Sequence, residues 1–174
     1  GEVVGIDNNF RKLFFGAAGD TSWNVARLKA LAPNYVHYDV DIRDADAVDR
    51  VFQAHRFETI IHCAAQPSHD KAAAIPQLDF AINANGTLNL LEATRRFCPE
   101  AVLIHVSTNK VYGDAPNELP LQELERRWDY ARPEDAGGIT EECRVDRCLH
   151  SLFGASKLAG DIMAQEYGRY FGLK

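Results

Sequence analysis

Two short segments of this chain carry side chains that could perform chemistry. The first, Ser107-Thr108-Asn109-Lys110-Val111-Tyr112-Gly113, directly follows the apolar run 101–106, which predicts a buried strand ending in hydroxyl and amide groups. The second, Phe153-Gly-Ala-Ser-Lys157, comes after a long polar stretch. Ligands of open α/β sheets bind at the carboxyl ends of the strands, so we expect the two segments to meet there.

Thr108 and Lys157 suit the oxidation of a hydroxyl group. The threonine can hydrogen-bond a substrate hydroxyl, and the lysine can bind a cofactor ribose and hold positive charge near the reacting centre. A tyrosine four residues before the lysine usually supplies the base, because positive charge lowers the phenol pKa from about 10. Phe153 stands at that position and has no proton to exchange. The open alternatives are a loss of catalysis or a replacement base from Tyr112, Cys148, His150 or elsewhere in 114–150.

The elements that must position these residues alternate between strand and helix patterns. Apolar runs predict strands at 3–6, 35–40, 59–63 and 101–106, and helical periodicity predicts helices near 21–31, 45–55, 78–97 and 151–171. Segments 10–20 and 67–76 are predicted loops, and the polar segment 114–150 is a predicted long loop or lid. This alternation predicts an α/β fold, with a parallel sheet covered by helices on both faces.

The bulk composition is that of a globular domain. Of the 174 residues, 46% are hydrophobic and 25% are charged, as in soluble proteins. The net charge of −6 disfavours partners such as nucleic acid or an anionic membrane, which need a basic face. Four scattered cysteines favour reduced thiols in a cytoplasmic protein. We expect no metal, although Cys143, Cys148 and His150 are an alternative zinc set with unusual spacing.

Several motifs, taken in order, resemble the extended short-chain dehydrogenase/reductases, and in particular the NAD-dependent epimerase/dehydratase family that acts on nucleotide sugars. The motifs are Asp7-Asn8, Asp41-Ile42-Arg43-Asp44, Ile61-His62-Cys63-Ala64-Ala65-Gln66, Asn83-Ala84-Asn85-Gly86-Thr87, Ser107-Thr108-Asn109-Lys110-Val111-Tyr112-Gly113-Asp114 and Phe153-Gly-Ala-Ser-Lys157. The resemblance covers essentially the whole chain. It implies a doubly wound parallel sheet of the Rossmann type, NAD as cofactor, a nucleotide-sugar substrate with a CDP-sugar favoured, and a homo-oligomer.

The resemblance also implies roles for individual residues. The implied cofactor-binding positions, from the adenosine ribose and adenine to the pyrophosphate and nicotinamide ribose, are Asp7, Asn8, Asp41, Ile42, Ala64, Ala65, Gln66, Asn83 and Lys157. Thr108 and Lys157 form the implied catalytic pair. Asn109 and Gln66 are the implied substrate contacts.

Charged residues near Asp7 bear on the choice between NAD and NADP. A carboxylate at a strand tip can accept both ribose hydroxyls, and it would repel a 2′-phosphate. Arg11 and Lys12 lie close by in sequence and would favour that phosphate. We expect NAD, because Asp7 stands directly at the tip of the predicted strand.

The residues after Thr108 favour epimerisation over dehydration. Eliminating water needs a general acid and a base, and the related 4,6-dehydratases carry an acid pair at these two positions. Here the positions hold Asn109, which cannot transfer a proton in that way, and Lys110, which is normally charged. The expected reaction is NAD-dependent epimerisation at C2 of the sugar through a 2-keto intermediate. The alternatives are a 4-epimerase or reductase, or a non-catalytic nucleotide-binding relative.

The start of the chain resembles the middle of a domain, so we expect an internal fragment. In the family a glycine-rich turn after a first strand cradles the pyrophosphate, and no residue before Val3 supplies it. That strand would lie between the strands at 3–6 and 59–63, so the sheet should contain a gap. Residues 1–174 are then a partial NAD-binding domain without the C-terminal substrate domain. We expect them to bind NAD weakly and to be inactive alone.

Overall fold

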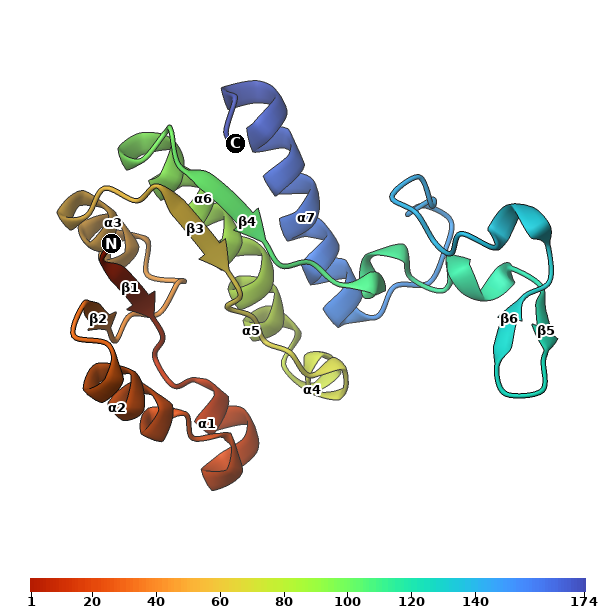
Figure 1. The fold of residues 1–174 in the computed structure, drawn as a ribbon, viewed down its shortest axis with the longest axis horizontal. Coiled ribbons are helices and arrows are strands. Elements are labelled where there is room, and N and C mark those ends of the chain that lie inside the picture. The colour runs from red at the N-terminus through yellow and green to blue at the C-terminus, as the bar shows by residue number, and fades with distance from the viewer.

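Parallel strands and helices alternate along most of the chain. The computed structural model describes residues 1–174 (Figure 1). The strands of the body are β1 (Val3–Ile6), β2 (Tyr35–Tyr38), β3 (Thr59–His62) and β4 (Val102–His105). The helices are α1 (Arg11–Phe15), α2 (Ser22–Leu31), α3 (Ala45–Ala54), α4 (His69–Ala74), α5 (Pro76–Phe80), α6 (Gly86–Phe97) and α7 (Leu152–Phe171). None of these helices has the length and apolarity that crossing a membrane requires.

The four strands form two separate parallel pairs. Val3 pairs with Tyr35 in the β1–β2 sheet, and Thr59 pairs with Val102 in the β3–β4 sheet. No ladder joins β1 to β3. A groove of about 280 Å³ lies between them, lined by apolar residues such as Ile6 and Ile61. The predicted gap in the sheet is therefore confirmed, and both strands present unpaired backbone groups to it.

Three helices form a layer on one side of the strands, with α6 between α3 and α7. Val48, Val51 and Phe52 of α3 form the buried face that the helical periodicity predicts, and they share a core with Leu90 of α6. Asp44 caps α3, because its carboxylate accepts a hydrogen bond from the backbone N–H of the third helical residue at 3.0 Å. The opposite face of β3 and β4 is exposed, with Ile61 62% accessible.

The long helix predicted at 78–97 is interrupted by one wide turn. Helix α5 continues through a π-helical segment, Ala81–Asn85, directly into α6. The poor helix formers Asn83 and Gly86 lie at this interruption. Gly86 leaves room for Ile42, because a Cβ there would approach the Ile42 Cδ1 atom to 2.5 Å. Gly86 thus serves close packing at the interruption, and Asn83 serves hydrogen bonding, because its side chain pairs with Gln66 and Asp79.

Two predicted loops contain short helices. Helix α1 lies in 10–20, where Phe14 is buried, and α4 lies in 67–76, where Ser68 caps the first turn by accepting from the Lys71 N–H at 3.3 Å. Such short helices depend on tertiary contacts, so sequence periodicity does not reveal them.

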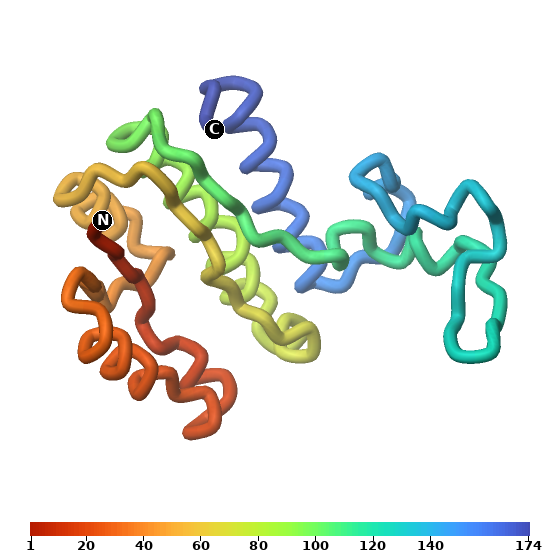
Figure 2. Tube along the Cα trace, viewed as in Figure 1, coloured from red at the N-terminus to blue at the C-terminus, as the bar shows by residue number.

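The segment 114–150 also differs from a simple loop. It contains 3₁₀ turns and an antiparallel hairpin of β5 (Leu121–Glu123) and β6 (Trp128–Tyr130). Figure 2 shows this hairpin standing apart from the strands and helices of the body. The hairpin strands are three residues each, too short for an alternating pattern to stand out.

Two glycines of α7 provide a matched test of the packing. A Cβ at Gly160 would lie 2.9 Å from the backbone oxygen of Asn83, whereas one at Gly168 would make an ordinary contact of 3.5 Å. We expect Gly160→Ala to lower the free energy of unfolding by about 1–3 kcal/mol through overpacking. Gly168→Ala should raise it by up to about 1 kcal/mol through helix propensity. Urea unfolding followed by circular dichroism measures both, and equal effects would contradict the close crossing of α7 over the π turn.

Candidate functional site

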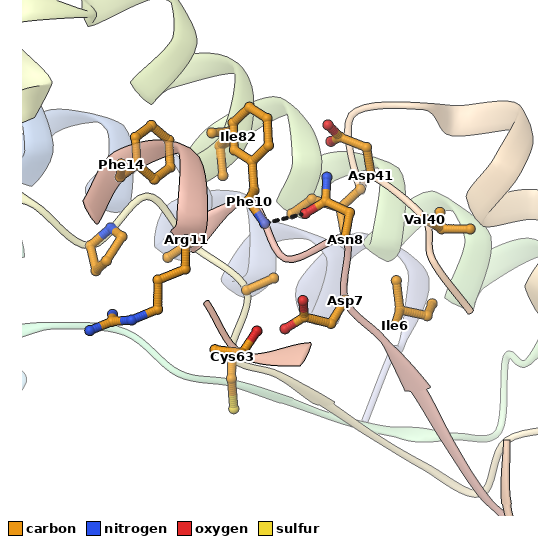
Figure 3. Close-up of a pocket in the computed structure, with 15 residues that line it drawn as sticks. Ile6, Asp7, Asn8, Phe10, Arg11, Phe14, Val40, Asp41, Cys63 and Ile82 are labelled. Atoms are coloured by element: carbon orange, nitrogen blue, oxygen red, sulfur yellow. Dashed lines mark hydrogen bonds between the residues drawn. The ribbon is translucent and has the colours of Figure 1, made fainter. Parts of the chain in front are cut away.

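A cavity of about 300 Å³ lies at the carboxyl ends of β1 and β3, and we call it the tip cavity (Figure 3). It brings together most of the cofactor-binding positions that the sequence predicts, namely Asp7, Asn8, Asp41, Ile42, Ala64 and Ala65. The remaining walls include Phe10, Arg11 and Cys63. Residues from four separate chain segments therefore converge at the sheet edge where ligands of α/β proteins bind.

A tight turn after β1 shapes one wall of the tip cavity. The Asn9 N–H donates to the Asp7 carboxylate at 2.6 Å, and the Phe10 N–H donates to the Asn8 side-chain oxygen at 3.1 Å. Asn9 has a φ of 55°, in the left-handed region that asparagine tolerates. The second carboxylate oxygen of Asp7 has no partner within the chain, and Asp7 is exposed. It is therefore free to accept hydroxyl groups of a ligand.

The second acidic residue of the cavity is already paired. Arg43 Nη2 lies 2.6 Å from Asp41 Oδ2, and this hydrogen-bonded guanidinium holds the pKa of Asp41 below its ordinary value. Ile42 is buried, with its side chain against Gly86. Asp41 and Ile42 thus form a rigid wall, and Asp7 is the polar group that remains available to a ligand.

A buried hydrogen-bond network supports the cavity from below. The Asp79 carboxylate accepts hydrogen bonds from Gln66 Nε2 at 2.7 Å, Asn83 Nδ2 at 3.2 Å and Ser156 Oγ at 2.5 Å. All four residues are at most 1% exposed. The network connects the segment after β3, helix α5, the π turn and helix α7. Asn83 is not among the residues that line the tip cavity, and its side-chain oxygen accepts from the Gln66 N–H at 2.8 Å.

Gln66 departs from its predicted role. Its side chain is fully buried, and its amide is used by Asp79 and by the backbone of Ser68. It therefore does not reach a substrate or line the cofactor path, as the sequence motif had suggested. The reason is Asp79, which sequence reasoning missed. Its position four residues before Asn83, on the same face of a predicted helix, was the available signal.

Lys157 lies at the end of β4, where it was expected. Its ammonium donates to the Val106 carbonyl at 2.9 Å, and the residue is 5% exposed. Burial lowers the pKa of Lys157, and the nearby Asp161 and Cys63 partly offset this shift. Asp161 also accepts a short hydrogen bond from the Ser107 hydroxyl. Helix α7 thus brings a lysine and a carboxylate to the strand end that carries Thr108.

Two histidines lie side by side beneath Lys157. His62 of β3 and His105 of β4 are register partners, with ring centroids 5.3 Å apart. Thr87 Oγ1 donates its hydrogen to the Asn83 carbonyl, so His62 Nε2 must donate to Thr87 Oγ1 at 2.9 Å. Burial, with further contributions from His105 and Lys157, lowers the pKa of His62 to about 3. Burial and Lys157 also lower the pKa of His105, against an opposing effect of Asp161.

A second cavity of about 700 Å³, which we call the Thr108 cavity, contains the other predicted site residues, Thr108 and Asn109. Its polar walls also include Tyr112, Glu141, Cys143 and Asp161. Cys148 and His150 are not among its lining residues, because they pack around Gly113 instead. Burial raises the pKa of Tyr112, helped by Glu141 and other acidic neighbours, which makes this phenol a poor base. No three His, Cys, Asp or Glu side chains lie together in an arrangement that could hold a metal ion.

Phe153 lies in the first turn of α7, directly before the buried polar network. Its carbonyl oxygen lies 3.0 Å from Ser156 Oγ, whose hydrogen is donated to Asp79. Gly154, the next residue, lies against the Lys110 carbonyl, which a Cβ would approach to 2.7 Å. The first turn of α7 is thus locked to the segment after Thr108, and the absence of a phenol at position 153 is not compensated by another residue of this turn.

The tip cavity fits the adenosine half of NAD. It offers a free carboxylate for the ribose hydroxyls and apolar walls for a purine, and Ala64 and Ala65 leave the backbone accessible to a ligand. A glycine-rich turn for the pyrophosphate is not among its lining residues. Asp7 and Asn8 would hold the ribose, and Lys157 would contact the nicotinamide ribose.

Known proteins are similar to this chain in sequence. The profile of the NAD dependent epimerase/dehydratase family matches residues 13–174. CDP-paratose 2-epimerase from Salmonella typhi is 35% identical over 172 residues, which are 99% of this chain and 47% of that protein. UDP-glucuronate 4-epimerase 6 from Arabidopsis thaliana is 30% identical over 172 residues, which are 98% of this chain and 32% of that protein.

Solved structures share the fold. A double mutant of dTDP-glucose 4,6-dehydratase from Streptomyces venezuelae, crystallised with NAD, has a TM-score of 0.70 and 25% identity. The match covers 99% of this chain and 44% of that one. The chain therefore spans less than half the length of each of these relatives.

The buried network can be tested through its central carboxylate. Asp79→Asn replaces one acceptor oxygen by an amide donor that faces other donors, so we expect a loss of about 1–3 kcal/mol in the free energy of unfolding. Asp70→Asn is the matched control, because the Asp70 side chain is 100% exposed. Denaturant unfolding compares the two variants. A loss no larger in Asp79→Asn than in the control would contradict the network.

The histidine pair predicts a pH dependence of stability. The unfolded chain takes up a proton on each histidine as pH falls through the ordinary value of 6.5, whereas folded His62 stays neutral until about pH 3. The contribution of His62 to the free energy of unfolding is therefore fully present well above pH 6.5. It falls by about 2 kcal/mol between pH 7 and pH 5. His62→Gln should flatten this slope, and His69→Gln, an exposed control, should not. Denaturant unfolding across that pH range measures both, and an unchanged slope in His62→Gln would refute the assignment.

Proposed function

Because the chain belongs to the NAD-dependent epimerase/dehydratase family, we propose that it forms the cofactor-binding part of a nucleotide-sugar epimerase. The substrate we propose is a CDP-3,6-dideoxyhexose such as CDP-paratose, inverted at C2. One observation carries the proposal. Thr108 follows β4, where Lys157 is buried, and the next two positions hold Asn109 and Lys110 rather than acids.

The substrate assignment rests on similarity. CDP-paratose 2-epimerase from Salmonella typhi matches nearly the whole chain. Within the family, the segments 107–114 and 166–173 look most like CDP-tyvelose (CDP-paratose) 2-epimerases. Relatives named for other nucleotide sugars match with lower identity, as the 4-epimerase from Arabidopsis thaliana does, or over less of the chain, as a UDP-glucose 4-epimerase that is 35% identical over 58% of it does. These similarities support a CDP-sugar over a UDP- or dTDP-sugar.

The chemistry divides between cofactor and chain. NAD, when bound, supplies reversible hydride acceptance. The Thr108 hydroxyl would hydrogen-bond the sugar hydroxyl that becomes a ketone, and the Lys157 charge would stabilise the negative charge that develops on that oxygen. The hydroxyl proton needs an acceptor because Phe153 cannot take it. Glu141 and Asp161 are the carboxylates that the Thr108 cavity offers for this step.

Dehydration is disfavoured by the two residues that follow Thr108. Loss of water requires an acid that protonates the leaving hydroxyl and a base at the neighbouring carbon. The position after Thr108 holds the amide of Asn109, which lines the cavity and receives a weak contact from Thr108 Oγ1 at 3.4 Å. An amide offers no proton for that transfer. Oxidation followed by reduction on the other face of the sugar needs no such acid.

Phe153 favours one other candidate function. Without a phenol in the first turn of α7, the chain could be a nucleotide-binding module that has lost its chemistry. Such a module would keep the tip cavity and its supporting network while making no use of Thr108. A 4-epimerase or reductase of the same fold is the remaining alternative within the enzyme class.

Isotope labelling tests the proposed reaction. A chimera that places residues 1–174 in the corresponding half of the Salmonella typhi relative is incubated with NAD and CDP-paratose deuterated at C2. We expect inversion at C2 with the deuterium retained, because the hydride returns to the carbon it left. Thr108→Val should lower turnover by about 100-fold or more, through loss of a hydrogen bond to the developing oxyanion. Thr140→Val, at an exposed position, should leave turnover unchanged.

Three results would count against the proposal. NAD binding without conversion of any nucleotide sugar would favour the binding module. Loss of the deuterium to solvent would indicate proton abstraction rather than hydride transfer. Full activity of Thr108→Val would remove the threonine from the mechanism. Nuclear magnetic resonance of the product reports both the configuration at C2 and the fate of the label.

A further inference from the structure

Arg11 lines the tip cavity, and the two basic residues that directly follow lining residues in the sequence, Lys12 and Arg43, are neutralised. Lys12 Nζ lies 2.7 Å from Asp20 Oδ2, and Arg43 Nη2 lies 2.6 Å from Asp41 Oδ2. Arg11 lines the cavity and forms no ion pair. The sequence alone could not separate Arg11 from Lys12, and the structure leaves Arg11 as the cation that a ligand can use.

The Arg11 guanidinium has a defined position. Its Cζ atom lies 4.8 Å from the centroid of the Phe15 ring, and Lys71 Nζ lies 5.8 Å from the same centroid. The ring attracts both cations. Two positive charges close to one ring repel each other, and Lys71 also forms no ion pair. An anion bound between them would relieve this repulsion.

The cavity also contains a carboxylate that is not paired with Arg11. Asp7 and Arg11 occupy separate walls, Asp7 after β1 and Arg11 on α1 (Figure 3). A carboxylate is suited to the hydroxyls of a ribose, and a guanidinium is suited to two oxygens of a phosphate. A ligand that carries both groups in one unit is a nucleotide.

The position of Asp7 determines whether a 2′-phosphate or a 5′-phosphate of such a ligand can be accommodated. If Asp7 accepts the 2′- and 3′-hydroxyls, a 2′-phosphate would place its charge against the carboxylate. The phosphates on the 5′ side of the ribose point away from Asp7 and are free to reach Arg11. Both features of the cavity are then used without conflict between like charges.

We propose that Arg11, assisted by Lys71, binds the 5′-diphosphate of the dinucleotide at the mouth of the tip cavity. This inference rests on the proposed NAD site and adds a specific phosphate contact to it. Arg11 supplies positive charge to a diphosphate from the side of α1. The affinity of the chain for adenine nucleotides should therefore depend on this one arginine and on the presence of a 5′-phosphate.

Titrations of the 174-residue chain with adenosine, 5′-ADP and adenosine 2′,5′-bisphosphate test the inference. Amide chemical shifts detect the weak binding expected. We expect 5′-ADP to bind about 10-fold or more tightly than adenosine, since a hydrogen bond to a charged group contributes about that factor. Arg11→Gln should bring the ratio close to one, and Arg11→Lys should restore part of it. Arg27→Gln is the matched control, because Arg27 is exposed on α2 outside the cavity.

Each result decides a separate point. If adenosine does not bind, the adenosine site of the proposed function falls, and the Arg11 contact falls with it. If adenosine binds but Arg11→Gln keeps the full preference for 5′-ADP, the Arg11 contact alone is overturned. If Arg11→Gln instead removes a preference for adenosine 2′,5′-bisphosphate over 5′-ADP, Arg11 binds the 2′-phosphate. The assignment of Arg11 to the 5′ side is then wrong. Circular dichroism confirms that each variant keeps its helices.

Discussion

The Asp79 carboxylate is the interaction on which the candidate site depends. This carboxylate is fully buried and has no cation beside it. Its oxygens accept hydrogen bonds from three neutral side chains instead. These donors come from the segment after β3, from the π turn and from α7. One buried carboxyl group thus connects the segment after β3 and the π turn to the first turn of the helix that carries Lys157. A single acceptor holds together parts of the candidate site that are far apart in sequence.

The gap between β1 and β3 has a different effect on the site. The residues around the tip cavity come from both strand pairs, yet no backbone ladder connects these pairs. Their relative position is set by side chains such as Phe14 and Ile82, which belong to one apolar core. The hydroxyl and ammonium groups near β4 lie entirely within the second pair and its helices. The end of the candidate site that holds Thr108 and Lys157 is therefore better supported than the end that holds Asp7.

The sequence predicted the parts of this structure that depend on regular patterns. Strand runs, the apolar face of α3 and the cap at Asp44 follow from local rules, and so does the gap, given the family resemblance. Gln66 was misjudged because its orientation depends on a contact with Asp79 that spans two elements. The hairpin in 114–150 was missed because its strands are too short to show a period. The sequence also could not show which cation near the cavity is paired, because Arg11 and Lys12 are equivalent in sequence and only the structure distinguishes them.

The missing ladder has a consequence for behaviour at low temperature. The two strand pairs are joined by apolar burial, in which Val48 and Phe52 of α3 contribute side chains that are at most 2% exposed. Apolar burial weakens on cooling, whereas a backbone ladder does not share this loss. The apolar contact between the two strand pairs should therefore weaken on cooling before the strands within either pair separate. Two strand pairs that share an apolar core but no ladder are in this sense connected by a cold-sensitive contact.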